Sequence, residues 1–179
     1  CELVYTYDRL FAEYNHTVAQ ILLTGEDIAD EKRRSNFENT VEKLLDMEAL
    51  PIINENDTVA TEEIVIGDND TLGAVAAKCM GADLLIILSD IDGLYTADPH
   101  TDSSAQLISE VSELTDDIML LGGSATTTLG TGGMKTKLHA AEIATESGCD
   151  MVIANGKDPA ILYDIIEGKS IGTRFRGKK

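Results

Sequence analysis

The stretch Leu84-Leu85-Ile86-Ile87-Leu88-Ser89-Asp90 decides the fold class of this chain. Its first five residues are all apolar, and the two that follow are polar. An unbroken apolar run of this length is typical of a central strand in a parallel sheet, where both faces are covered. We therefore expect a central strand over residues 84–88, with Ser89 and Asp90 at its carboxyl end.

Strands and helices alternate outward from this strand in both directions. Predicted strands cover residues 18–23, 50–53, 62–66, 151–154 and 171–175, and hairpin-type segments cover 91–96 and 106–111. Predicted helices cover the first residues of the chain and residues 30–47, 72–79, 134–147 and 159–167. The helix over 72–79 takes Asn69 or Asp70 as its N-cap. This alternation predicts an α/β fold with a largely parallel sheet.

Composition and charge narrow the class of protein. The 179 residues correspond to one domain, and 32 Asp and Glu against 14 Lys and Arg give a formal net charge of −18. Nucleic acids and anionic membranes are bound by basic surfaces, so we expect neither as a partner. The longest apolar run is far shorter than the roughly 20 residues of a membrane helix. Cys1, Cys79 and Cys149 are odd in number and widely spaced, which indicates neither disulfides nor a zinc site and favours the cytoplasm.

Polar clusters lie where ligands of open α/β sheets collect, outside the carboxyl ends of strands. They are Asn54 to Asp57, Ser89-Asp90, and the glycine-rich segment 130–133 that leads to Lys135 and Lys137. A glycine-rich loop entering a helix presents free N–H groups and the positive end of the helix dipole, which suits a phosphate. The spacing matches neither the P-loop nor the dinucleotide pattern, because other residues stand where those patterns need glycine. A solvated loop before an ordinary basic helix is the alternative.

The segment Asp68-Asn69-Asp70 places two carboxylates between a predicted strand and a helix. Such a pair could bind Mg²⁺ together with phosphate oxygens, or hold an ammonium group. The alternative is helix capping, and Asn54 and Asp57 have a turn-forming alternative as well. The three histidines are scattered, and no Ser-His-Asp or Cys-His arrangement is indicated.

Four segments in this order resemble the amino acid kinase superfamily, and within it the glutamate 5-kinase family. They are Pro51 to Asp57, Gly67 to Asp70, Leu88-Ser89-Asp90 with Asp92 to Pro99, and Gly130 to Met134 with Lys137. The resemblance implies a three-layer α/β/α sandwich with an open, mostly parallel sheet, in which ATP and the acceptor lie across the strand ends. It implies transfer of the ATP γ-phosphoryl group to the side-chain carboxylate of L-glutamate, giving L-glutamyl 5-phosphate in the first step of proline biosynthesis.

The resemblance also assigns roles to single residues. Asp57, Asn69 and Asn54 correspond to glutamate-binding residues, and Asp70 corresponds to the aspartate that organises the catalytic lysines. Lys137 and Mg²⁺ supply positive charge to the transferred phosphoryl group, and no metal ligand is assigned. No general base is needed, because a glutamate carboxylate with a pKa near 4.3 is already ionised at neutral pH. The implied ATP-binding residues are Ser89, Asp90, Thr131, Gly132, Gly133, Met134, Lys135, Thr136 and Lys137.

The chain departs from the family pattern at its start. A first strand with a lysine and a glycine/serine loop does not precede Cys1, so residues 1–179 are predicted to be a partial amino acid kinase domain with little activity alone. The resemblance also implies proline as a feedback inhibitor and a homo-oligomer, and it leaves a C-terminal PUA domain open. Two alternatives stay open: a sibling kinase for acetylglutamate, aspartate, carbamate or UMP, and a non-catalytic module that binds ligand or proline.

Overall fold

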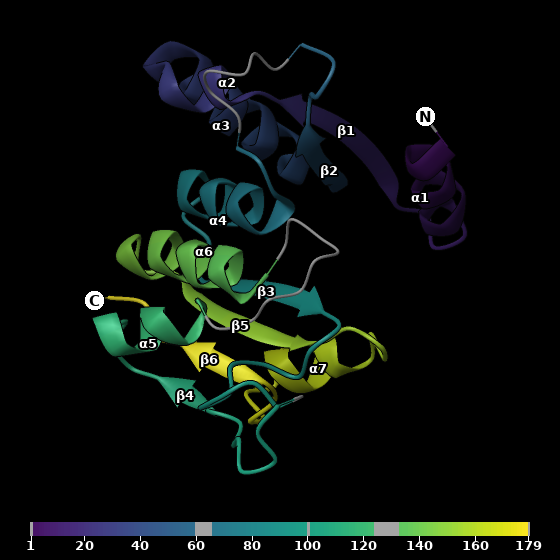
Figure 1. The fold of residues 1–179 in the computed structure, drawn as a ribbon. Helices are drawn as coiled ribbons and strands as arrows, with labels where there is room; N and C mark the ends of the chain where they lie inside the picture. The colour runs from purple at the N-terminus through teal and green to yellow at the C-terminus, as the bar shows by residue number, and fades with distance from the viewer. Residues whose placement is uncertain (1, 60–65, 100, 124–132, 179) are drawn as a thin grey trace. The chain divides into compact units, whose positions relative to one another are not determined.

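The computed structural model describes residues 2–59, 66–99, 101–123 and 133–178. The chain divides into two compact units, Cys1–Leu72 and Gly73–Lys179. Each unit has its own strands and helices (Figure 1). Among the residues described, no helix is long and apolar enough to span a membrane.

The first unit is built around a parallel pair of strands. It contains α1 (Glu2–Ala12), β1 (Thr17–Leu23), α2 (Gly25–Ala29), α3 (Glu31–Asp46), β2 (Ala49–Glu55) and the start of α4 (Asn69–Cys79). The pair β1–β2 runs in register from Thr17 opposite Ala49 to Leu23 opposite Glu55. Both strands therefore end at the same edge of their sheet, because α2 and α3 return the chain to the starting edge.

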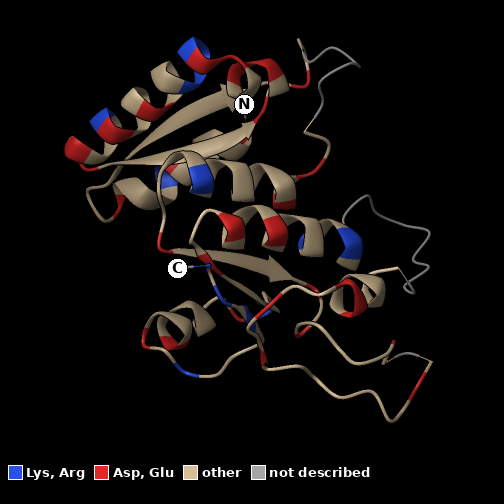
Figure 2. Cartoon of the chain, turned by 90° about the vertical axis from the view of Figure 1, so that its left-hand side faces the viewer, with Lys and Arg blue, Asp and Glu red and all other residues tan. Residues whose placement is uncertain are grey.

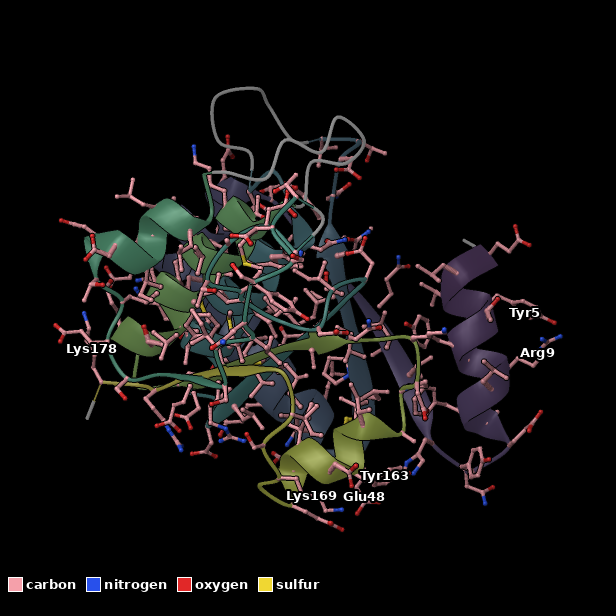
Figure 3. All side chains as sticks on the ribbon, turned by 60° about the horizontal axis from the view of Figure 1, so that its bottom comes forward. Tyr5, Arg9, Glu48, Tyr163, Lys169 and Lys178 are labelled. Carbon is pink, nitrogen blue, oxygen red and sulfur yellow. The ribbon has the colours of Figure 1, made fainter. Side chains whose placement is uncertain are left out.

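Apolar residues at helical spacing explain how α3 packs. Phe37 and Val41 lie four residues apart on one face and are the buried residues of this helix. In contrast, α1 has no buried residue, although its sequence predicts an amphipathic helix. Tyr5 and Arg9 project outward from it (Figure 3).

The second unit contains a four-stranded mixed sheet. Its elements are the rest of α4, β3 (Leu84–Ser89), β4 (Glu110–Val111), α5 (Asp116–Leu121), α6 (Met134–Glu146), β5 (Asp150–Asn155), α7 (Ile161–Ile166) and β6 (Thr173–Phe175). The strand order is β3-β5-β6-β4. Strands β3 and β5 are parallel, β5 and β6 are antiparallel, and β6 and β4 are parallel.

Strand β5 is the centre of this unit, and its side chains alternate between two helical layers. Met151 and Ile153 belong to the cluster that includes Leu138 of α6. Val152 and Ala154 belong to a second cluster with Ile165 of α7. Within this unit the layering is therefore helix, sheet, helix, and the predicted α/β class with parallel-rich pairing is confirmed.

Two sequence-based expectations need correction, and two short helices were not predicted. In the described part of the chain, β3 is an edge strand and not a central one, and Leu88 is 42% exposed. Helix α4 begins at Asn69, so its cap is Asp68 rather than Asn69 or Asp70, because the Asp68 carboxylate accepts the Thr71 N–H at 2.8 Å. The short helices α2 and α5 were not predicted.

The remaining predicted elements stand at or near their expected positions. The hairpin-type segments meet through an antiparallel bridge between Tyr95 and Leu107. The strand predicted over 62–66 falls almost wholly on residues 60–65, outside the described residues.

Candidate active site

The carboxyl ends of β3 and β5 lie side by side in the second unit. Ser89 ends β3 opposite Asn155, the last residue of β5. The N–H of Gly156 donates to the Ser89 carbonyl at 2.7 Å, and the Ser89 hydroxyl donates to the Asp90 carboxylate at 3.1 Å. Ser89 and Asp90, the first two residues predicted to bind ATP, therefore mark the point where these two strands end together.

The side chain of Asn155 connects the two strand exits. Its Nδ2 donates to the Asp92 carboxylate at 2.8 Å and reaches the Asp90 carbonyl at 3.5 Å, while its Oδ1 accepts the Lys157 N–H at 3.0 Å. Asp92 also accepts the Tyr95 hydroxyl at 3.1 Å. Burial, together with the hydrogen bond to Asp92 and its charge, raises the pKa of the Tyr95 phenol.

Helix α6 brings its first turn toward this edge of the sheet. The helix returns along β5 in the opposite direction, so its N-terminus lies toward the carboxyl end of that strand (Figure 1). Gly133 is the N-cap, and no side chain caps the helix. The Gly133 carbonyl accepts the Thr136 N–H at 3.1 Å and the Thr136 hydroxyl at 2.8 Å. A helix start without a side-chain cap presents N–H groups and the positive end of its dipole, which suits an anion.

The charged residues at the start of α6 are basic, which favours an anion at this end of the helix. Its first turn carries Lys135 and Lys137 and no acidic residue. Figure 2 shows blue ribbon in the early turns of α6 and red ribbon in the later ones. Lys135 is exposed, whereas Lys137 is only 6% exposed. An ammonium group in so buried a position acts through a lower effective dielectric than one in water, so its charge has a stronger effect on a neighbouring anion.

Gly122 fixes the position of this first turn. A Cβ atom at Gly122 would lie 2.8 Å from Leu138 Cδ1 and 3.2 Å from the Lys135 Cα. Glycine therefore lets α5 end close against the lysine-bearing turn, where any larger residue would have to displace Leu138 or the α6 backbone. Met134 begins the helix and is half-buried, while Thr131 and Gly132, also predicted to bind ATP, lie outside the described residues.

The first unit carries the residues predicted to bind glutamate. Asn54 is exposed and stands opposite Leu22 near the end of β2. Asp57 is exposed and lies in a turn in which the Val59 N–H donates to the Asn56 carbonyl at 3.1 Å. The turn-forming alternative therefore describes the backbone around Asp57, while its carboxylate faces solvent.

The acidic residues at the start of α4 have different positions, since Asp68 caps the helix and Asp70 lies in its first turn. Asp68 accepts the N–H and the hydroxyl of Thr71, both at 2.8 Å, so its carboxylate is engaged in capping. Asn69 is exposed and Asp70 is half-buried in the first turn of the helix. Capping by Asp68 leaves the side chains of the next two residues to other partners.

Two residues in these clusters were not singled out from the sequence. Asn155 follows a predicted buried strand, as Ser89 does, so the rule that found Ser89 could have found it. Glu55 lies inside the segment 54–57, but its hydrogen bonds join it to residues eleven and twelve positions away. No local sequence pattern indicates such bonds.

The described residues contain no group of three or more His, Cys, Asp or Glu side chains placed to hold a metal ion. Mg²⁺ prefers one or two carboxylates together with the phosphate oxygens of a bound nucleotide. Asp90, an exposed carboxylate at the end of β3, has the donor chemistry for such a shared site.

Comparison with known proteins places this arrangement in a family. The sequence model of the Amino acid kinase family matches residues 2–155. The chain belongs to the amino acid kinase family.

Relatives within the amino acid kinase family are close in sequence. The chain is 52% identical over 177 residues to a protein named glutamate 5-kinase from Clostridium tetani, covering 99% of this chain and 66% of that protein. It is 46% identical over 183 residues to the glutamate 5-kinase of Clostridium perfringens, covering 100% of this chain and 68% of the relative. A glutamate 5-kinase of Photorhabdus laumondii is 48% identical, and the chain covers 48% of it. The chain thus spans about half to two thirds of the length of these relatives.

The architecture is also similar to that of a solved structure. The UMP kinase from Bacillus anthracis matches with a TM-score of 0.60 at 16% identity, covering 92% of this chain and 60% of that one. At this level of identity, the match supports the fold alone.

Proposed function

We propose that the whole protein is a glutamate 5-kinase, which transfers the γ-phosphoryl group of ATP to the side-chain carboxylate of L-glutamate. The observation that carries the proposal is Lys137, a nearly buried lysine in the uncapped first turn of α6. The choice of glutamate as acceptor is supported by relatives about 50% identical to this chain that carry the name glutamate 5-kinase. These relatives disfavour the sibling kinases as alternatives.

The reaction needs positioning and positive charge more than acid–base chemistry. A carboxylate oxygen of glutamate attacks the γ-phosphorus, the bond from that phosphorus to the β,γ-bridging oxygen breaks, and ADP leaves with the electron pair. The nucleophile is ionised at neutral pH, so no proton has to move. What opposes the reaction is the approach of two anions and the charge on the transferred group. Lys137 supplies a fixed positive charge, and the N-terminus of α6 adds N–H groups.

We assign ATP to the second unit and glutamate to the first. Ser89, Asp90 and the first turn of α6 would hold the nucleotide, and Asp90 would be the carboxylate available to Mg²⁺. The metal would neutralise part of the phosphate charge when bound. Asp57 and Asn69 would hold glutamate, with the Asp57 carboxylate accepting from the α-ammonium group. Asp70 would have the role that the resemblance assigns to it, which is to organise the catalytic lysines of the whole protein.

Four further features belong to the same proposal. Residues 1–179 would form part of one amino acid kinase domain, with the two compact units as its parts. Proline would inhibit the whole protein, and that protein would form a homo-oligomer in the cytoplasm. Proline titration of the activity tests the inhibition, and light scattering of the purified protein tests the homo-oligomer.

Hydroxamate trapping tests the function directly. The whole native protein should form γ-glutamyl hydroxamate from ATP, glutamate and hydroxylamine, and show at least tenfold lower kcat/KM with acetylglutamate, aspartate, carbamate or UMP. Asp57→Asn should raise the KM for glutamate and leave the KM for ATP within about twofold. Preference for another acceptor in the panel would contradict the proposal, and a selective rise in the KM for ATP would show that the two sites are exchanged.

A further inference from the structure

We propose that Glu55 is a positioning residue that sets the geometry of the glutamate site by clamping together the two segments that form it. This inference rests on the proposed function. The two segments are Asn54–Asp57, at the end of β2, and Gly67–Asp70, at the start of α4.

The clamp is a pair of hydrogen bonds from backbone to carboxylate. The Ile66 N–H donates to Glu55 Oε1 at 2.9 Å, and the Gly67 N–H donates to Glu55 Oε2 at 3.4 Å. Each carboxylate oxygen thus accepts one of two successive amides. Bonds from N–H groups to an ionised carboxylate are stronger than those between neutral groups. The carboxylate therefore fixes both the position and the direction of the chain at residues 66–67.

Glu55 is itself held by the sheet. It is the last residue of β2 and pairs with Leu23 of β1. The next residue, Asn56, continues this pairing, because its N–H donates to the Leu23 carbonyl at 2.6 Å. The Glu55 backbone is therefore fixed by the β1–β2 ladder. Residues 66 and 67, which its carboxylate binds, are held against that fixed backbone.

The far end of the clamp lies directly before the α4 start. Gly67 has a φ of +88°, which turns the chain between Ile66 and the helix. Asp68 then caps α4, and Asn69 and Asp70 occupy its first turn. A carboxylate that holds residues 66 and 67 therefore holds Asn69 within three residues of a fixed point, while Asp57 is two residues from Glu55 on the other side.

Glu55 does not need to touch glutamate for this role. Neighbouring residues of a strand point to opposite faces, so the Asn54 and Glu55 side chains project in different directions. Both oxygens of Glu55 already accept an amide each. Its removal should change the spacing between Asp57 and Asn69 and so weaken glutamate binding, while the α6 turn and the β3 and β5 exits belong to the other unit.

Steady-state kinetics on the whole native protein test the proposal. Glu55→Ala should raise the KM for glutamate roughly ten- to a hundredfold and leave the KM for ATP within about twofold, since small displacements of substrate-positioning groups have effects of this size. Glu55→Gln, which keeps one carbonyl acceptor, should recover part of the loss. Glu42→Ala, which removes an exposed glutamate of α3, is the matched control and should leave both KM values unchanged.

Amide hydrogen exchange gives a readout that does not depend on activity. In Glu55→Ala the Ile66 and Gly67 amides should exchange at least tenfold faster, while the amides of the β1–β2 ladder keep their protection. Equal changes in the two KM values, a fall in kcat alone, or unchanged exchange at residues 66 and 67 would each overturn the positioning role. A wild-type protein that does not phosphorylate glutamate would overturn the proposed function, and the role of Glu55 in it, while the exchange result would still report on the clamp itself.

Discussion

Thr173→Val should loosen the segment that follows Asp90, because one buried hydroxyl holds both sides of that segment. Thr173 lies in β6 and is fully buried. Its Oγ1 accepts the Leu94 N–H at 2.8 Å and donates to the Ile108 carbonyl at 2.6 Å. Leu94 and Ile108 are themselves joined, since the Ile108 N–H donates to the Leu94 carbonyl at 2.8 Å. The Thr173 hydroxyl thus bonds to both segments of the hairpin.

The size of the effect follows from which groups lose a partner. Valine has the shape of threonine but no hydroxyl, so the N–H of Leu94, which is 1% exposed, is left buried without an acceptor. Such a loss costs about 1–3 kcal/mol, and the partly buried Ile108 carbonyl adds less because water can reach it. The added methyl group offsets about 1 kcal/mol. We expect a net loss of about 1–3 kcal/mol.

Urea unfolding and amide exchange measure this change. The free energy of unfolding of the second unit should fall by about 1–3 kcal/mol, and the Leu94 amide should exchange about tenfold faster, since about 1.4 kcal/mol corresponds to a factor of ten. Thr173→Ser keeps the hydroxyl and should preserve the protection of the Leu94 amide while it loses about 0.8 kcal/mol for one methyl group. A valine variant with wild-type stability and unchanged Leu94 exchange would refute the reasoning.

Three further perturbations test the α6 turn and the charge network at the start of β5. Lys137→Met keeps the apolar stem and should lower kcat about 100- to 1,000-fold, the size seen when one group that stabilises transition-state charge is lost. Lys135→Met, at an exposed position, is the control and should lower kcat less than about tenfold. Equal decreases in kcat would contradict the special role of the buried lysine. Gly122→Ala should destabilise the protein by about 1–3 kcal/mol and lower kcat, because the new Cβ would press on Leu138 and on the Lys135 backbone. Gly123→Ala is its control, since among the described residues the nearest atom to a Cβ there is the Leu120 carbonyl oxygen at an ordinary 3.4 Å, and equal effects at the two positions would refute the packing argument. Burial opposes ionisation of Asp150, but hydrogen bonds from the Gly177 N–H, Arg174 and Arg176 outweigh it and lower the pKa of this carboxyl. Because the pKa is lowered, the ionised carboxylate stabilises the fold above the unfolded pKa of about 3.9, and this stabilisation is lost as the pH falls below that value. The difference in unfolding free energy between wild type and Asp150→Asn should therefore shrink in urea titrations below about pH 4. A constant difference would contradict this assignment.

Local sequence patterns predict elements well where burial alone decides the structure. The apolar run 84–88 and the buried strand 151–154 both form strands at the expected positions. The edge position of β3 could not be predicted in the same way, because strand order depends on contacts between distant parts of the chain. Leu88 is apolar yet 42% exposed, so hydrophobicity did not reveal how its strand is covered.

The sequence also singled out candidates for the site. Polar residues at strand ends and the resemblance to a family point to Asp57, Ser89 and Lys137, whose roles stay predictions. The burial of Lys137 depends on how α6 packs, which no spacing reveals. The bonds of Glu55 and Asn155 join segments far apart in sequence, so only the folded chain shows them.

The first turn of α6, which carries lysines and no Asp or Glu, affects how fast a nucleotide would bind. Under the proposed function, the formal net charge of −18 on this chain repels ATP and glutamate at long range, and salt screens this repulsion beyond a Debye length of about 8 Å at physiological ionic strength. The attraction of Lys135, Lys137 and the helix dipole acts only at close range. Added salt should therefore speed the arrival of nucleotide, the opposite of what a basic nucleotide-binding surface shows, until it also weakens the bound state.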